Sequence, residues 1–150
     1  IFIMQALKGE WITVYGDGKQ LRSFTDVRDV VRAMVEIVKV EGAEGQVFNV
    51  GSEQEVAINH LAALGTQTLG SSSPIVHVPY REAYGPDFEV LSRRLPDITK
   101  LRQFIDYRPN TDLVSIIREV AADIRAREGL SQEVDGERRT AKRVLQEGAP

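Results

Sequence analysis

Cysteine is absent from the 150-residue sequence, which excludes a disulfide scaffold, a thiolate zinc site and a cysteine nucleophile. The two histidines, His60 and His77, stand alone without paired ligands, so we expect no metal site. No apolar stretch reaches membrane-spanning length, and a net charge of −3 does not favour nucleic acid as the main partner. We therefore expect a cytoplasmic protein that binds neither nucleic acid nor a membrane.

Several catalytic motifs are also missing. The sequence contains no Gly-x-Ser-x-Gly, no phosphate loop ending in Gly-Lys-Ser/Thr and no Gly-x-Gly-x-x-Gly. Tyr80 and Tyr84 each lack a lysine four residues further on, so no obvious proton-transfer group is present. The chain begins on an apolar run without methionine or a basic leader, which we interpret as a chain entered in the middle of its fold.

The sequence does contain alternating helix and strand signals. An apolar content of 42% suits one folded domain. Residues 27, 30, 31, 34, 35 and 38 are apolar at helical spacing, and Asp26 precedes them as an N-cap. We expect helices over residues 1–8, 27–38, 58–69, a short segment after Asp97 and 113–128, and strands over 11–15, 47–50 and 75–78. This order predicts an α/β fold.

Two arginine positions could hold an anion. Arg22 follows the glycine turn at residues 16–18, and Arg93-Arg94 ends a long stretch without clean periodicity. The planar guanidinium binds phosphate well, and two arginines with a nearby aromatic ring would suit a diphosphate and a base. From the residues alone, solvated surface arginines remain an open alternative.

Three motifs in order carry a family resemblance. Tyr-Gly-Asp-Gly-Lys-Gln-Leu-Arg-Ser-Phe, Val-Phe-Asn-Val-Gly-Ser and Arg-Arg-Leu-Pro-Asp-Ile together resemble the C-terminal part of NAD-dependent nucleotide-sugar epimerases, dehydratases and decarboxylases, the extended short-chain dehydrogenases. The resemblance runs from about residue 1 to residue 127. It implies an α/β fold made of the last strand of a Rossmann-type sheet, at residues 47–50, and a small substrate-binding α/β domain.

The resemblance also implies a substrate site. Arg22 and Arg94 match arginines that contact the diphosphate, and Arg94 matches a residue with a possible accessory role in catalysis. Tyr15 and Gln20 match positions beside the substrate, and Phe88 matches an aromatic residue that packs on uracil. The glycine-rich NAD loop and the Tyr-x-x-x-Lys catalytic pair of the family are not present.

These observations predict a nucleotide-sugar-binding portion over residues 1–128 and a charged tail over 129–150. The substrate would be a UDP- or dTDP-sugar, and NAD would serve the intact enzyme without binding to this chain alone. We expect a homodimer or other self-association. The alternatives are a stand-alone nucleotide-binding module and an interaction domain whose arginines are merely exposed.

Overall fold

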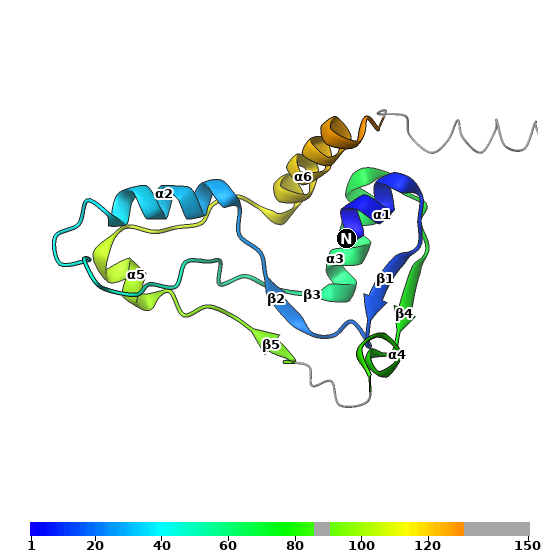
Figure 1. Ribbon diagram of the computed structural model, residues 1–150, viewed down its shortest axis with the longest axis horizontal. Helices are drawn as coiled ribbons and strands as arrows, with labels where there is room; N and C mark the ends of the chain where they lie inside the picture. Colours follow the sequence, from blue (N-terminus) through cyan, green and yellow to red (C-terminus); the bar gives the residue numbers. More distant parts are fainter. Residues whose placement is uncertain (86–90, 131–150) are drawn as a thin grey trace, which may run out of the picture.

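The computed structural model describes residues 1–85 and 91–130, and Figure 1 shows how they are arranged. In chain order the elements are α1 (Phe2–Lys8), β1 (Ile12–Tyr15), β2 (Leu21–Ser23), α2 (Val27–Ile37), β3 (Glu55–Ala57), α3 (Ile58–Leu69), β4 (Ile75–Val78), α4 (Tyr80–Tyr84), β5 (Arg93–Arg94), α5 (Thr99–Phe104) and α6 (Leu113–Glu128).

One lobe is a parallel strand pair covered by helices. β1 pairs with β4 in parallel, with Ile12 opposite Ile75, and α1 and α3 pack beside the pair (Figure 1). Ile12 and Val14 are fully buried and form a core with Ala6 and Ala62. β-branched residues suit such strands because they pack well on a pleated surface.

A three-stranded sheet lies between this lobe and a second one, in the strand order β3-β2-β5. β2 is antiparallel to β3 and parallel to β5. In Figure 1 the sheet runs from the α1–α3 lobe toward α2 and α5. β2 leads directly into α2 on one side and follows the turn after β1 on the other, so it fixes the spacing of the two lobes.

The second lobe packs α2 and α5 around Tyr107. The ring of Tyr107 is 1% exposed and contacts Ala33, Ile98 and Leu101, with Phe48 and other half-buried side chains at the edge. Lys100 places its Nζ 4.8 Å from the centre of the Phe48 ring, a cation–π distance. The second lobe therefore has its own small apolar core.

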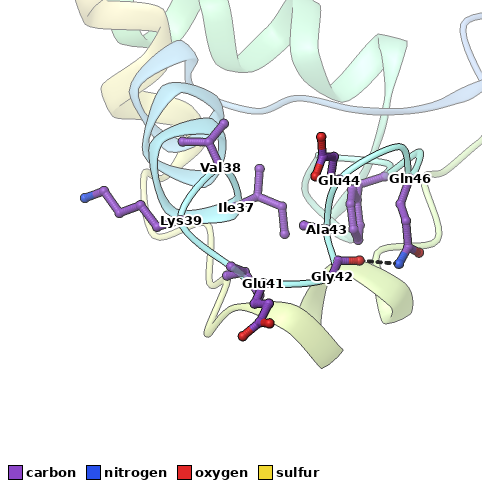
Figure 2. Close-up of a pocket in the computed structure, with 10 residues that line it drawn as sticks. Ile37, Val38, Lys39, Glu41, Gly42, Ala43, Glu44 and Gln46 are labelled. Carbon is purple, nitrogen blue, oxygen red and sulfur yellow. Dashed lines mark hydrogen bonds between the residues drawn. The ribbon is translucent and has the colours of Figure 1, made fainter.

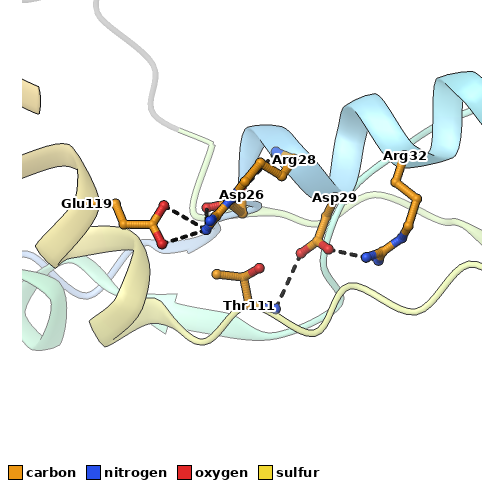
Figure 3. Close-up of polar contacts among 6 residues, drawn as sticks. All are labelled: Asp26, Arg28, Asp29, Arg32, Thr111 and Glu119. Carbon is orange, nitrogen blue, oxygen red and sulfur yellow. Dashed lines mark hydrogen bonds and ion pairs between the residues drawn. The ribbon is translucent and has the colours of Figure 1, made fainter.

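Polar contacts attach α2 to α6 and to the segment that precedes it (Figure 3). Asp26 caps α2 by accepting from the Arg28 backbone N–H at 2.8 Å, and Arg28 also donates to Glu119 on α6 at 2.7 Å. The buried Asp29 accepts from Arg32 at 2.8 Å and from the Thr111 backbone N–H at 3.3 Å. Because the carboxylate of Asp26 is bonded to Arg28, the pKa of Asp26 is lowered.

Most predicted elements are confirmed. The helices at 1–8, 27–38, 58–69 and 113–128 and the strands at 11–15 and 75–78 are present within a residue or so. Gly9 and Gly129 end α1 and α6 in the left-handed conformation, with φ of 67° and 63°, and Asp112 caps α6. The capping residues named from the sequence therefore act as helix signals.

The predicted strand at residues 47–50 is wrong. Residues 47–50 have no sheet partner among the described residues and are assigned no strand, although Phe48 and Val50 pack against the Tyr107 core. Val47 is 83% exposed. An apolar, β-branched run gives the propensity for a strand, but a strand also needs a neighbour with which to exchange backbone hydrogen bonds.

Two expectations concern residues that lie outside the described ranges. Phe88 falls within 86–90, and most of the predicted tail, 131–150, is also outside. α6 ends at Glu128, so the boundary between 1–128 and 129–150 stays a prediction. Across residues 1–85 and 91–130, we find no helix with the length and apolar character needed to cross a membrane.

Candidate functional site

Arg22 and Arg94 lie side by side although they are far apart in the sequence. β2 and β5 are parallel neighbours whose register sets Arg22 directly opposite Arg94. Both arginines line a pocket of about 520 Å³ between the β1–β4 lobe and the three-stranded sheet. The Arg22 guanidinium donates to the neighbouring Leu21 carbonyl at 2.7 Å, and within the described ranges neither arginine forms an ion pair with a carboxylate. Among the described residues, the pocket therefore holds two arginines without a carboxylate partner.

Arg93 differs sharply from its neighbour Arg94. The Arg93 guanidinium forms two hydrogen bonds with the Glu55 carboxylate on β3, at 2.6 and 2.9 Å. This bidentate pair spans the sheet, and the hydrogen bond from Arg93 lowers the pKa of Glu55. Alternation along β5 sends the two arginine side chains to opposite faces. Arg93 thus links β5 to β3, whereas Arg94 lines the pocket.

Three tyrosines form the aromatic side of the pocket. Tyr15 and Tyr84 meet edge to face with ring centres 5.2 Å apart, and Tyr80 lies 6.2 Å from Tyr84. Tyr15 ends β1, and Tyr80 follows β4, so both occupy the carboxyl ends of parallel strands. Ligands of open α/β sheets bind at such ends. Burial raises the pKa of Tyr80, and the positive charge of Arg22 opposes this shift, so Tyr80 remains a neutral phenol near neutral pH.

Gln20 offers an unsatisfied acceptor at the same place. Its Nε2 donates to the Tyr15 carbonyl at 3.1 Å, which fixes the orientation of the side chain. Its Oε1 is buried and accepts no hydrogen bond from the described residues, and Gln20 lines the pocket. A buried acceptor without a donor is costly, so a ligand hydroxyl or N–H placed there would be favoured.

A second hollow adjoins the first and shares both arginines. Its volume is about 560 Å³, and Ser23, Asn49 and Asp97 line it together with Arg22 and Arg94. The two guanidinium groups therefore stand at the junction of two cavities, one aromatic and one polar. An extended anion could reach into both while its charged centre rests on the arginines.

A different pocket of about 570 Å³ lies at the far end of the second lobe (Figure 2). It is lined by the loop after α2, including Lys39, Glu41 and Glu44. Gln46 donates to the Gly42 carbonyl across it at 2.6 Å. The charged side chains that line this pocket are exposed, carry both signs and do not point together into a buried centre. We therefore consider it a surface hollow and not the functional site.

The structure brings together four of the five residues named from the sequence, Tyr15, Gln20, Arg22 and Arg94, while Phe88 lies outside the described residues. Sequence reasoning did not assign Tyr80 and Tyr84 to the site. The available signal was their position directly after the strand at 75–78, where α/β proteins place ligand-binding residues. In the described part of the chain, no group of acidic or histidine side chains could hold a metal ion.

Comparison with known proteins identifies relatives. Residues 1–51 match the NAD dependent epimerase/dehydratase family. The chain is 42% identical over 118 residues to UDP-N-acetyl-alpha-D-glucosaminuronate decarboxylase of Bacillus cytotoxicus, covering 79% of this chain and 36% of that protein. It is 33% identical to UDP-glucuronic acid decarboxylase 2 of Arabidopsis thaliana, covering 84% of this chain and 26% of that protein.

A solved structure supports the same relationship. UDP-glucose 4-epimerase of Thermotoga maritima, solved with UDP-glucose, matches with a TM-score of 0.72 at 25% identity, over 83% of this chain and 38% of that one. The chain thus spans about a quarter to two fifths of the length of the relatives it matches.

The family match corrects the part of the enzyme to which the sequence analysis assigned the chain. The predicted C-terminal, substrate-binding portion, with a last Rossmann strand at residues 47–50, is wrong. Residues 1–51 match the family of the NAD-binding, Rossmann-type region, and β1 and β4 form a helix-covered parallel pair of the kind that region contains. The three motifs led to the C-terminal assignment. The glycine-rich loop is absent from the sequence, but a parallel α/β unit can lie within the Rossmann-type region without carrying the loop.

The recognition of the family itself did not depend on that assignment. The similarity to sugar-nucleotide decarboxylases extends over about four fifths of the chain. The chain is therefore related to the NAD-dependent nucleotide-sugar epimerases and decarboxylases.

Proposed function

We propose that the pocket between β1, β2, α4 and β5 binds a nucleotide sugar, a UDP- or dTDP-sugar, through its diphosphate. The observation that carries the proposal is the register of β2 and β5, which sets Arg22 opposite Arg94 without a carboxylate partner for either in the described residues. Two planar guanidinium groups match the geometry and charge of a diphosphate.

The other pocket residues suit the rest of such a ligand. The Tyr15, Tyr80 and Tyr84 rings supply apolar faces for a base or a sugar ring, and the free Oε1 of Gln20 accepts from a hydroxyl or imide group. Phe88, six positions before Arg94, stays a proposed stacking residue for uracil. The sugar itself is left open, because the relatives act on several different ones.

The reaction of a whole enzyme containing this site would be NAD-dependent epimerisation, dehydration or decarboxylation, with Arg94 in a possible accessory role. The 150-residue chain lacks the glycine-rich loop and the Tyr-x-x-x-Lys pair, so we propose that it binds the nucleotide sugar without converting it. Incubation of the purified chain with NAD and UDP-glucuronic acid, followed by chromatography, should yield no product. NAD-dependent product formation would contradict this assignment.

A series of ligands with successively fewer groups tests the binding proposal. In calorimetric titrations we expect UDP-glucose and UDP to bind, UMP to bind at least tenfold more weakly, and uridine to give no measurable heat, because affinity follows the diphosphate. Uridine binding as tightly as UDP would overturn the proposal. A second candidate function is a stand-alone nucleotide-binding module, which predicts the same order of affinities. Supplying the remaining part of a related enzyme distinguishes the two, because only the enzyme-portion interpretation predicts that turnover then appears.

A further inference from the structure

Residues 49–52, which we call the bridging segment, contact both the end of β2 and the chain that follows β5. Ser52 is 8% exposed, and its backbone N–H donates to Thr25 Oγ1 at 2.7 Å. The Ser52 carbonyl accepts a hydrogen bond from the Ser23 hydroxyl. Because Ser23 comes directly after Arg22 on β2, these bonds fix the bridging segment relative to the strand that carries the first pocket arginine.

The other contacts of the bridging segment lie just beyond β5. Asn49 Nδ2 donates to the Asp97 carbonyl at 3.2 Å. Gly51 is buried and lies so close to Pro96 that an added Cβ would stand 2.6 Å from the Pro96 Cγ. Pro96 comes two residues after Arg94, so this contact lies next to the second pocket arginine.

Position 51 requires glycine for reasons of space and not of backbone angle. The φ of Gly51 is not positive, so an alanine there would meet no left-handed strain. A Cβ at 2.6 Å from the Pro96 Cγ, however, is far inside the roughly 3.5–4.0 Å at which carbon atoms pack. The Pro96 ring is closed on the backbone nitrogen and cannot rotate away, and proline keeps the preceding Leu95 extended. A displaced Pro96 would therefore move Arg94 as well.

β5 depends on contacts of this kind because it contains only two residues, Arg93 and Arg94. The ion pair between Arg93 and Glu55 attaches the first of them to β3. The contact between Pro96 and Gly51 holds the chain beyond the second. These two attachments lie on either side of Arg94 in the sequence, so together they restrict where its backbone lies beside β2.

We propose that Gly51 is a positioning residue for Arg94. By letting Pro96 pack against the bridging segment, it sets the place of Arg94 relative to Arg22 in the pocket. Gly51 is not among the described residues that line either of the cavities shared by the arginines, so its effect passes through Pro96. The consequence for ligand affinity rests on the proposed diphosphate site, whereas the consequence for the position of Arg94 needs no ligand.

Two alanine substitutions in the full 150-residue chain form a matched pair. Gly65 on α3 is also buried, its φ is not positive, and a Cβ there would meet nothing within 4 Å. In nuclear magnetic resonance spectra recorded without ligand, Gly51→Ala should shift the backbone amide and side-chain Nε–H signals of Arg94, and Gly65→Ala should leave them in place.

A change on the other side of the contact tests the same link. Pro96→Ala should also shift the Arg94 signals, because the ring that packs on Gly51 is lost. The double variant Gly51→Ala/Pro96→Ala should bring them back toward their original positions, since the added methyl group then fills the space of the removed ring atoms.

Ligand binding provides a second readout. In calorimetric titrations with UDP-glucose, Gly51→Ala should weaken binding by about threefold or more, and Gly65→Ala should leave it unchanged. Adding Gly51→Ala to Arg94→Ala should cause no further loss, because the effects of residues that act through one another are not additive. A loss that persists in the Arg94→Ala background would show that Gly51 supports the fold in general, and this would overturn the proposal.

The Arg94 signals decide the proposal in every case. Unchanged signals in both Gly51→Ala and Pro96→Ala, equal shifts in Gly65→Ala, or a double variant whose signals stay displaced would each overturn it. Should Gly51→Ala fail to fold by circular dichroism, Pro96→Ala decides alone. If the unchanged chain does not bind UDP-glucose, the proposed function fails, and the Arg94 signals still show whether Gly51 positions that residue.

Discussion

At the scale of single residues, Tyr107 combines a well-packed ring with a buried hydroxyl whose lost hydration no described residue replaces. Its ring fills the centre of the second core at 1% exposure, while its hydroxyl has no hydrogen-bond partner among the described residues. Burial raises the pKa of Tyr107, and the nearby Asp29 carboxylate adds to the shift. The ring contributes stability through packing, and the hydroxyl offsets part of that contribution.

Tyr107→Phe should therefore be neutral or stabilising, by up to about 1 kcal/mol, since it removes a buried polar group without opening a cavity. Tyr107→Ala should destabilise by about 3–5 kcal/mol through the cavity it leaves. Urea denaturation followed by circular dichroism measures both. A loss of more than about 1 kcal/mol on Tyr107→Phe would show that the hydroxyl is bonded in solution, for instance to a buried water.

At the scale of elements, the turn between β1 and β2 contacts the pocket, because Gly16 lies against the Tyr80 ring. Gly9 and Gly16 both have positive φ, 67° and 74°, so an alanine at either position pays a similar backbone cost of about 1–2 kcal/mol. A Cβ at Gly9 would meet nothing within 4 Å, whereas a Cβ at Gly16 would overlap the Tyr80 ring. The two glycines form a matched pair.

Gly16→Ala should destabilise the chain more than Gly9→Ala and should also weaken UDP-glucose binding, because the Tyr80 ring must move out of its place in the pocket. Gly9→Ala should leave binding unchanged. Denaturant midpoints and calorimetric titrations of the two variants provide the comparison. Equal effects on binding would mean that Tyr80 does not shape the site.

The start of α2 provides a pH-dependent contact. The hydrogen bonds that Arg28 makes to Asp26 lower the pKa of that carboxyl in the folded chain. A lowered folded pKa means that this contribution to stability is present above the unfolded value, about pH 4, and is lost as the pH falls through the folded value. The hydrogen bonds at Asp97 and Asp112 lower their pKa values in the same direction.

Stability should therefore fall as the pH drops below about 4. Asp26→Asn should lower stability at neutral pH and reduce the size of the acid-induced loss. Glu41→Gln, at an exposed acid in the loop after α2, should leave the acid-induced loss unchanged. Denaturant midpoints at neutral and acid pH measure this. An unchanged pH dependence in Asp26→Asn would contradict the assigned role of the cap.

At the scale of the whole molecule, the fold was predictable where the signal is local. Helix caps such as Asp26 and Asp112 and the apolar periodicity of α6 lie within a few residues of the elements they define. α4 and β5 are five and two residues long, too short for any period to be read. Residues 47–50 have strand propensity without a strand partner, and pairing partners are not encoded locally.

The site was predictable in its residues more than in its geometry. Arg22 and Arg94 were named from motifs that resemble a family, but their meeting depends on the β2–β5 register, which joins segments distant in sequence. The ion pair between Arg93 and Glu55 also joins residues distant in sequence, so local patterns could not predict it. The misassigned enzyme portion came from the likeness of three short motifs to a family, because a short motif indicates a family more safely than it places a segment within the family's fold.

The proposed function depends most on Arg22 and Arg94 acting at one anion site. Calorimetric titration with UDP-glucose of Arg22→Ala, Arg94→Ala and Arg81→Ala tests it directly, because Arg81 is an exposed arginine on α4 that does not line the pocket. Each charge-assisted hydrogen bond is worth roughly 1.5–3 kcal/mol, so losing Arg22 or Arg94 should weaken binding by about tenfold to a hundredfold, with no change for Arg81→Ala. Unchanged affinity in either pocket variant, or an equal loss in Arg81→Ala, would contradict the account.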